Sequence, residues 1–235
     1  MKILAIGAHP DDVEILCGGT LAIYARRGDD VAICHFCNGD KGGDISNTSS
    51  EKLAKIRRRE AIEAANLIGA KSMCGGIPDD EVVVDFKLRM KMVDIIRQVN
   101  PDVVFTHHPD DYLSDHTNVS RLVFEAIGIA SSSLSKTNYP CTSTRPVLYY
   151  MDTVAGINFN PLEYVDISET LDIKIKMVLK MNSQLDWLKE TYNCDLMELI
   201  KTTAKFRGFQ ANVSFAEAFA KHQMFSTGIA RRVLP

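Results

Sequence analysis

A three-layer α/β fold, with a mostly parallel sheet between two layers of helices, is predicted by three features of the sequence. Short apolar runs alternate with longer segments whose apolar residues have helical spacing. Turn residues such as Gly28 and Asn100-Pro101 separate many of these segments. The chain has 235 residues, is 46% hydrophobic and shows no linker, which suits one domain with a sizeable core. Strands and helices that alternate in this way indicate right-handed βαβ units.

Five apolar runs are expected to form buried strands, because they are short and bounded by turn residues. They cover residues 2–7, 31–37, 72–74, 102–106 and 146–151. The expected helices run from the loop after the first strand to about residue 28, and over 49–68, 86–99, 116–130 and 168–192. Residues 131–145 are expected to form a loop, and residues 196–235 to be helical or irregular. We therefore expect a single domain with a core over 1–152 and a C-terminal portion over 153–235.

The charge and the apolar pattern exclude several classes of protein. The net charge is −3 and no basic patch is present, so nucleic acid is not expected as a partner. No apolar run approaches the roughly 18 residues of a membrane span. The N-terminus lacks the pattern of a secretory signal, and the six scattered cysteines suit reduced thiols. These features predict a cytoplasmic protein.

The tetrapeptide His-Pro-Asp-Asp occurs twice, at residues 9–12 and 108–111. Each copy follows an apolar run, so each is expected at the carboxyl edge of a parallel sheet, where ligands bind. A histidine and two carboxylates just past a strand offer a metal ligand and a general base together. In the simpler alternative, Asp11 or Asp12 caps the next helix and His9 is an ordinary loop residue.

A second cluster of polar residues surrounds the later copy. Residues 106–116 contain three histidines and three aspartates. Spacing alone leaves His107, His108 and His116 open as metal ligands. A helix that starts at His116, capped by Asp115, would fix the His116 side chain more firmly than a position within a loop.

The chain resembles the LmbE-like (PIG-L) de-N-acetylases, over roughly residues 1–130 most clearly. The resemblance is carried by an Ala-His-Pro-Asp-Asp segment after the first strand and by a later Asp-His pair. The matching positions are Ala8–Asp12, Gly18-Gly19-Thr20, Asn38-Gly39, Arg57 with Glu60-Ala61, Pro101–Val104 and Asp115-His116.

The resemblance implies a Rossmann-like fold and a zinc-dependent hydrolase that removes acetyl from an N-acetylglucosamine-type sugar or sugar conjugate. It also implies a homo-oligomer, such as a hexamer. Carried over by position, the zinc ligands are His9, Asp12 and His116, and Asp11 is the general base. Further catalytic roles fall to His108 and Asp115, and substrate contacts to Arg57, Asn38 and Tyr112.

One position departs from the family pattern. The family's usual second motif is His-Pro-Asp-His, whereas this chain has Leu113-Ser114-Asp115-His116. Leucine cannot stabilise an oxyanion or protonate a leaving amine, which are the roles that the resemblance gives to this histidine. Either His108, His107 or Tyr112 replaces it, or the protein is a metal-binding member with altered or lost catalysis.

A Rossmann nucleotide-binding module without hydrolysis is the remaining alternative. Such modules carry G-x-G-x-x-G after the first strand, because the glycines let the backbone approach a pyrophosphate. Gly7-Ala8-His9-Pro10 does not fit that pattern. The sequence therefore favours the hydrolase.

Overall fold

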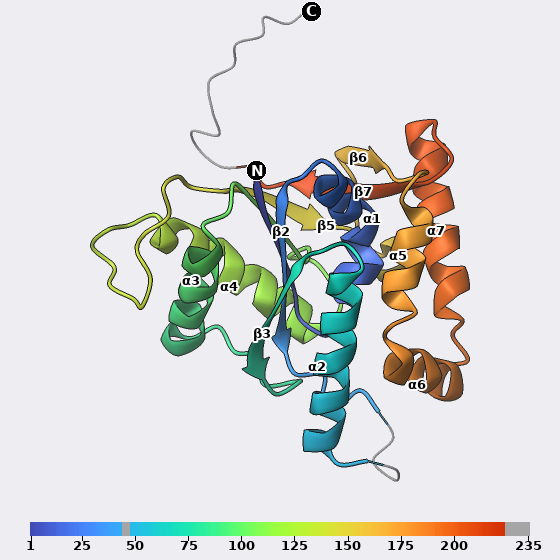
Figure 1. The fold of residues 1–235 in the computed structure, drawn as a ribbon, viewed down its shortest axis with the longest axis horizontal. Helices are drawn as coiled ribbons and strands as arrows, with labels where there is room; N and C mark the ends of the chain where they lie inside the picture. The colour runs from blue at the N-terminus through green and yellow to red at the C-terminus, as the bar shows by residue number, and fades with distance from the viewer. Residues whose placement is uncertain (44–47, 224–235) are drawn as a thin grey trace, which may run out of the picture.

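A seven-stranded sheet forms the centre of the protein, whose computed structural model describes residues 1–43 and 48–223. The strand order is β3-β2-β1-β4-β5-β7-β6. The first five strands in this order pair in parallel, and β7 runs antiparallel to both β5 and β6. The predicted fold class, a Rossmann-like sheet with helices on both faces, is confirmed (Figure 1).

The expected strands and most of the expected helices are present. The strands are β1 (Lys2–Gly7), β2 (Asp30–Cys37), β3 (Lys71–Ile77), β4 (Val103–Thr106), β5 (Val147–Met151), β6 (Glu163–Asp166) and β7 (Ala216–Lys221). The helices are α1 (Asp12–Arg26), α2 (Ser50–Asn66), α3 (Phe86–Val99), α4 (Ser114–Ala130), α5 (Leu171–Val178), α6 (Asn182–Tyr192) and α7 (Leu196–Ala211), with a 3-10 turn at Val154–Gly156. None of the helices in the described part of the chain is long and apolar enough to cross a membrane.

The C-terminal part differs from the expectation in two ways. The single helix expected over 168–192 is wrong, because the chain leaves helical geometry before Met181, which is buried in the core. The strands β6 and β7 were not expected either. β7 reads Ala-Glu-Ala-Phe-Ala-Lys, which has few residues that favour strands, and it is held in place by pairing with both β5 and β6.

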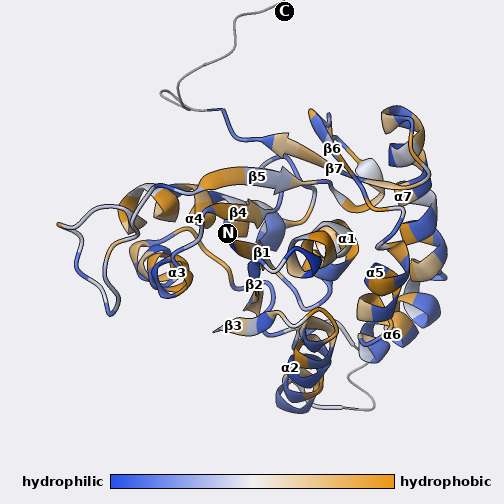
Figure 2. Ribbon diagram, turned by 45° about the horizontal axis from the view of Figure 1, so that its top comes forward, coloured by the Kyte–Doolittle hydropathy of each residue, from blue (hydrophilic) through white to orange (hydrophobic). Residues whose placement is uncertain are grey.

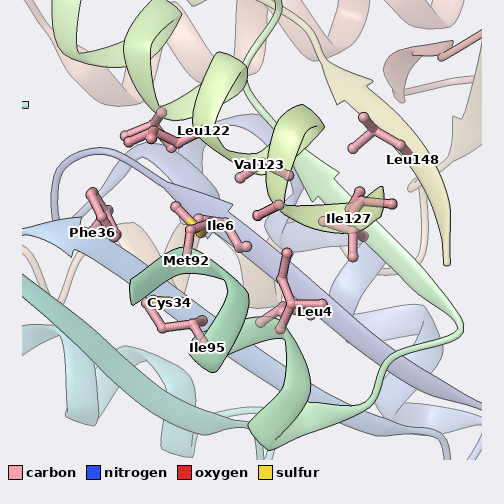
Figure 3. Packing of buried hydrophobic residues seen from close by; sticks show 14 of the residues in the cluster. Leu4, Ile6, Cys34, Phe36, Met92, Ile95, Leu122, Val123, Ile127 and Leu148 are labelled. Carbon is pink, nitrogen blue, oxygen red and sulfur yellow. The ribbon is translucent and has the colours of Figure 1, made fainter. Parts of the chain in front are cut away.

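Apolar side chains fill both sides of the sheet. On one face α3 and α4 pack over β1, β2 and β4, where Leu4, Ile6, Met92 and Leu122 interlock (Figure 3). On the other face α1 and α2 cover the same strands, and α5 lies against α1 (Figure 1). Figure 2 shows apolar stretches on β4, β5 and α1 near the centre, and a largely hydrophilic α2. Because helices cover both faces of the sheet, a functional site is expected at the ends of the strands.

The Gly18-Gly19-Thr20 motif joins α1 to the C-terminal part. The backbone N–H groups of Gly19 and Thr20 donate to the Glu217 carboxylate on β7, over 2.9 and 2.7 Å. Lys174 forms a buried ion pair with the same carboxylate at 2.6 Å. A Cβ atom at Gly19 would lie 2.8 Å from Ile167, so only glycine allows this close approach. The motif therefore has a structural role within the described residues.

Candidate metal centre

Two neighbouring strands bring distant parts of the sequence together at one edge of the sheet. β1 and β4 pair in parallel, and Ile6 lies opposite Thr106. The segment that holds His9 and Asp12 leaves β1 here, and α4 begins with His116 in its first turn just beyond β4. This is the carboxyl edge, where ligands bind in open α/β sheets.

Three side chains at this edge present ligand atoms to a common point. His116 Nε2 lies 3.2 Å from Asp12 Oδ1, and His9 Nδ1 lies 3.6 Å from Asp12 Oδ2. One ligand atom from each residue lies within 4.8 Å of the others. Two ligands at about 2.0–2.1 Å from a tetrahedral zinc lie roughly 3.3 Å apart, so the spacing suits this ion.

The surroundings of the His116 ring also bear on that fit. Its Nε2 atom is buried and makes no hydrogen bond of acceptable geometry among the described residues, although Asp12 Oδ1 lies 3.2 Å away. A buried nitrogen without a partner is costly unless something else binds it. The donor set of two imidazoles and one carboxylate is also common in catalytic zinc sites. The residues therefore fit a zinc ion.

A carboxylate orients each of the two histidines. Asp111 Oδ2 lies 3.0 Å from Nδ1 of His116, and Asp115 Oδ2 lies 3.2 Å from Nε2 of His9. Each pair leaves the opposite ring nitrogen for a metal, which is the usual arrangement around metal-binding histidines. Burial raises the pKa of both carboxyl groups, but the hydrogen bonds and charges of the histidines, together with backbone N–H donors, hold each pKa below its ordinary value.

Asp115 does not cap α4, so that part of the sequence prediction is wrong. The helix begins at Ser114, and Leu113 occupies the capping position without a side-chain hydrogen bond. The Asp115 carboxylate instead accepts from the backbone N–H of Asp80 at 2.7 Å, on the same oxygen that faces His9. Asp115 therefore lies on the Nε2 side of the His9 ring, opposite the nitrogen that is left for a metal.

Asp11 is a buried carboxylate in an unusual backbone conformation. Its φ of 131° lies in the region that favours glycine, and it occupies the capping position of α1 without a capping hydrogen bond. In the simpler alternative, Asp11 or Asp12 caps the next helix, but the Asp11 side chain makes no capping hydrogen bond. Burial raises the pKa of Asp11 and the charge of Arg57, 3.4 Å away, opposes that rise, with a net pKa of about 7. A carboxyl group with a pKa near neutrality suits general-base catalysis.

The remaining candidate residues lie around this centre with different surroundings. Arg57 is buried, and its Nη2 donates to the Pro10 carbonyl at 2.6 Å as well as facing Asp11. Asn38 follows β2 and lines a cavity of about 490 Å³ that Pro10 also borders. Tyr112 is exposed. Arg57 therefore contacts the loop that carries His9 and Asp12, and Tyr112 is accessible from solvent.

His108 does not join any cluster of possible metal ligands found in the described parts of the chain. Its ring packs edge-on against Tyr150 and Phe159, with centroids 5.7 and 5.1 Å away. Leu113 is 39% exposed, and its backbone N–H donates to Asp111 at 3.0 Å. The leucine thus lies beside the carboxylate that orients His116, with no acid–base group of its own.

The sequence alone does not indicate that Asp111 faces His116, or that the His107 ring stacks on His116 with centroids 3.8 Å apart. The available signal was the density of histidines and aspartates over 106–116. That density predicts a polar site, but the direction of each side chain depends on how β4 and α4 meet.

The fold and these side chains define a Rossmann-like α/β protein with a possible metal site beside a buried carboxylate. The chain belongs to the PIG-L family, because the family model described as GlcNAc-PI de-N-acetylase matches residues 4–127, more than half of the sequence.

The similar proteins include deacetylases and one enzyme of another class. The chain is 26% identical to a diacetylchitobiose deacetylase from Thermococcus kodakarensis, over 100% of this chain and 86% of that protein. The structure of N,N'-diacetylchitobiose deacetylase from Pyrococcus horikoshii has a TM-score of 0.82 and 26% identity, and covers 94% of this chain and 83% of that one. A 4-oxalmesaconate hydratase from Pseudomonas putida is 24% identical, over 96% of this chain and 87% of that protein.

Proposed function

We propose that the protein is a zinc-dependent N-deacetylase that acts on an N-acetylglucosamine-type sugar or sugar conjugate. The observation that carries this proposal is the convergence of His9, Asp12 and His116 beside the buried Asp11. Family membership supports the same activity, because relatives of this chain include N-deacetylases.

The proposed ligands of the zinc ion are His9, Asp12 and His116. When bound, the ion would polarise the amide carbonyl and lower the pKa of a water molecule. Asp11 takes the proton from that water as it attacks, since its raised pKa makes it a competent base near neutral pH. Asp115 acts through His9, and Asp111 acts through His116, as positioning residues.

The leaving amine must be protonated, and Leu113 cannot donate the proton that the family resemblance assigns to a histidine at this position. Asp11, once protonated, can deliver the proton to the amine nitrogen if the two groups lie close together. His107, His108 and Tyr112 remain the alternatives that the sequence offers for this step and for stabilising the oxyanion; the His108 ring packs against Tyr150 and Phe159. Burial lowers the pKa of His108, so this histidine is mostly neutral at neutral pH.

Substrate contacts are proposed for Arg57, Asn38 and Tyr112. Tyr112 is exposed and Asn38 borders a cavity, so both are accessible to a sugar hydroxyl. Arg57 is buried against Pro10 and Asp11, and we propose that it acts mainly by holding this loop.

We further propose a single-domain, cytoplasmic homo-oligomer, such as a hexamer, on the basis of the sequence and the family resemblance.

A hydratase is the second candidate function. Water addition to a carbon–carbon double bond adds a hydroxyl group to one carbon and a proton to the other and releases no amine, so it needs no proton donor to a leaving nitrogen at the position of Leu113. The similarity to 4-oxalmesaconate hydratase spans nearly the whole chain and gives this candidate specific support. In this form the protein would be a member of the family with altered catalysis.

A metal analysis combined with a substrate screen tests the proposal. The purified protein is expected to hold about one zinc ion per chain. It should release acetate from at least one of N-acetylglucosamine, diacetylchitobiose and N-acetylglucosaminyl malate. Hydration of 4-oxalmesaconate without acetate release would favour the second candidate. Absence of stoichiometric zinc would contradict both.

A further inference from the structure

His107 is a fully buried histidine that the proposed mechanism does not use. It directly follows β4 and is 0% exposed. Its Nε2 atom lies 2.9 Å from the backbone nitrogen of Ala8 and 3.2 Å from Asp12 Oδ2. Its ring stacks on His116, with centroids 3.8 Å apart and planes inclined by 15°. One side chain thus contacts two of the three proposed ligands and the residue before the third.

These contacts fix the ring whichever nitrogen carries the proton. One nitrogen cannot accept from Ala8 and donate to Asp12 at the same time. With a lone pair on Nε2, the ring accepts from the Ala8 N–H. With a proton there, it donates to the Asp12 carboxylate. Either state ties His107 to the loop that carries His9 and Asp12.

The surroundings of Asp12 show what this tie achieves. Its Oδ2 atom accepts from the backbone N–H of His9 at 2.6 Å and also faces His107. Its Oδ1 atom faces Nε2 of His116 across 3.2 Å, without the geometry of a hydrogen bond. The carboxylate is therefore oriented by one oxygen and presents the other toward the candidate metal position.

We propose that His107 is a positioning residue of the metal centre, which holds Asp12 and His116 in the arrangement that binds zinc. The inference rests on the proposed function, since it assumes that these residues are ligands. Neither phenylalanine nor asparagine meets both requirements. Phenylalanine keeps a flat ring against His116 but has no polar edge for Asp12 or Ala8. Asparagine keeps a polar group but cannot stack over the imidazole.

The test measures zinc affinity directly, by competition with a chelator, together with the visible spectrum of the cobalt-substituted protein. His107→Phe and His107→Asn are compared with the wild type. His222→Phe is the matched control, because His222 also bonds another side chain, Tyr150, at 2.9 Å. Loss of an outer partner of a ligand typically weakens metal binding by about 10–100-fold. We expect a weakening of this size in the His107 variants, an altered cobalt spectrum, and neither change in the control.

The outcomes separate this inference from the proposed function. Wild-type zinc affinity and an unchanged cobalt spectrum in both His107 variants would overturn it, even if their melting temperatures fall. If His107→Phe does not fold, His107→Asn decides by the same titration. A wild-type protein that binds no zinc would contradict the proposed function itself, and this inference with it.

Discussion

The two His-Pro-Asp-Asp segments have the same sequence but different roles around one centre. In the first copy, His9 and Asp12 face the candidate metal position, and Asp11 is buried beside it. In the second copy, the last residue, Asp111, contacts a proposed ligand, because its carboxylate lies 3.0 Å from Nδ1 of His116.

Backbone geometry explains this difference. The first copy turns sharply into α1, and the φ of 131° at Asp11 directs consecutive side chains into one site. The second copy is followed by a loop before α4, so Asp110 remains largely exposed and His108 turns toward Tyr150. A short motif therefore identifies a site only together with the element that follows it.

The largest expected effect comes from removing a proposed ligand. Asp12→Ala and His116→Ala should each lose stoichiometric zinc and with it nearly all activity, because two donors rarely hold zinc tightly. Metal content after gel filtration measures this. Full zinc occupancy in either variant would show that the first copy does not supply the site as described.

A smaller effect is expected from Asp111→Asn in the second copy. The amide keeps the shape but loses the charge that orients His116, so zinc affinity or activity should fall by about 10–100-fold. Chelator competition provides the measurement, and Asp110→Asn, at an exposed position, is the control. Equal effects of the two substitutions would contradict the separate roles of these residues.

The pH profile tests the pairing of Asp11 with Arg57. A base works when it is deprotonated, so kcat/KM should rise as the pH increases through the Asp11 pKa, which burial raises to about 7. Arg57→Gln removes the charge that lowers this pKa, so the midpoint should move upward by roughly one unit or more. A bound cation lowers the midpoint of the pH profile in the wild type and in Arg57→Gln alike. The test therefore compares the difference between the two midpoints. An unchanged midpoint in Arg57→Gln would contradict the claim that Arg57 lowers the pKa of the base.

The smallest effect is expected at Leu113, where the family resemblance places a histidine. Leu113→His should increase acetate release, though by less than the roughly 10²–10⁴-fold of an optimised acid–base residue. Initial rates on the best substrate from the screen provide the comparison. A loss of activity would indicate that leucine itself is required at this position, for example to contact an apolar part of the substrate.

The sequence predicted those features that depend on local pattern. The strand at Lys2–Gly7 and the helix Phe86–Val99 match their expected bounds, since the strand is a short continuous apolar run and the helix has strong apolar periodicity that ends at Asn100. β6 and β7 escaped prediction because tertiary pairing, rather than residue preference, makes them strands. Similarly, the proximity of His9, Asp12 and His116 could be inferred from a family resemblance, whereas the orienting contacts of Asp111 and His107 depend on packing between distant segments.

Asp11→Asn tests the central claim most directly, with Asp110→Asn as the same change at the same position of the second copy. The account predicts that Asp11→Asn retains about one zinc ion per chain and loses turnover by about 10²–10⁴-fold, because the amide cannot accept the proton from water. Asp110→Asn should match the wild type in both measurements. Full turnover in Asp11→Asn would contradict the role of Asp11 as the base, and with it the division of labour between the two segments.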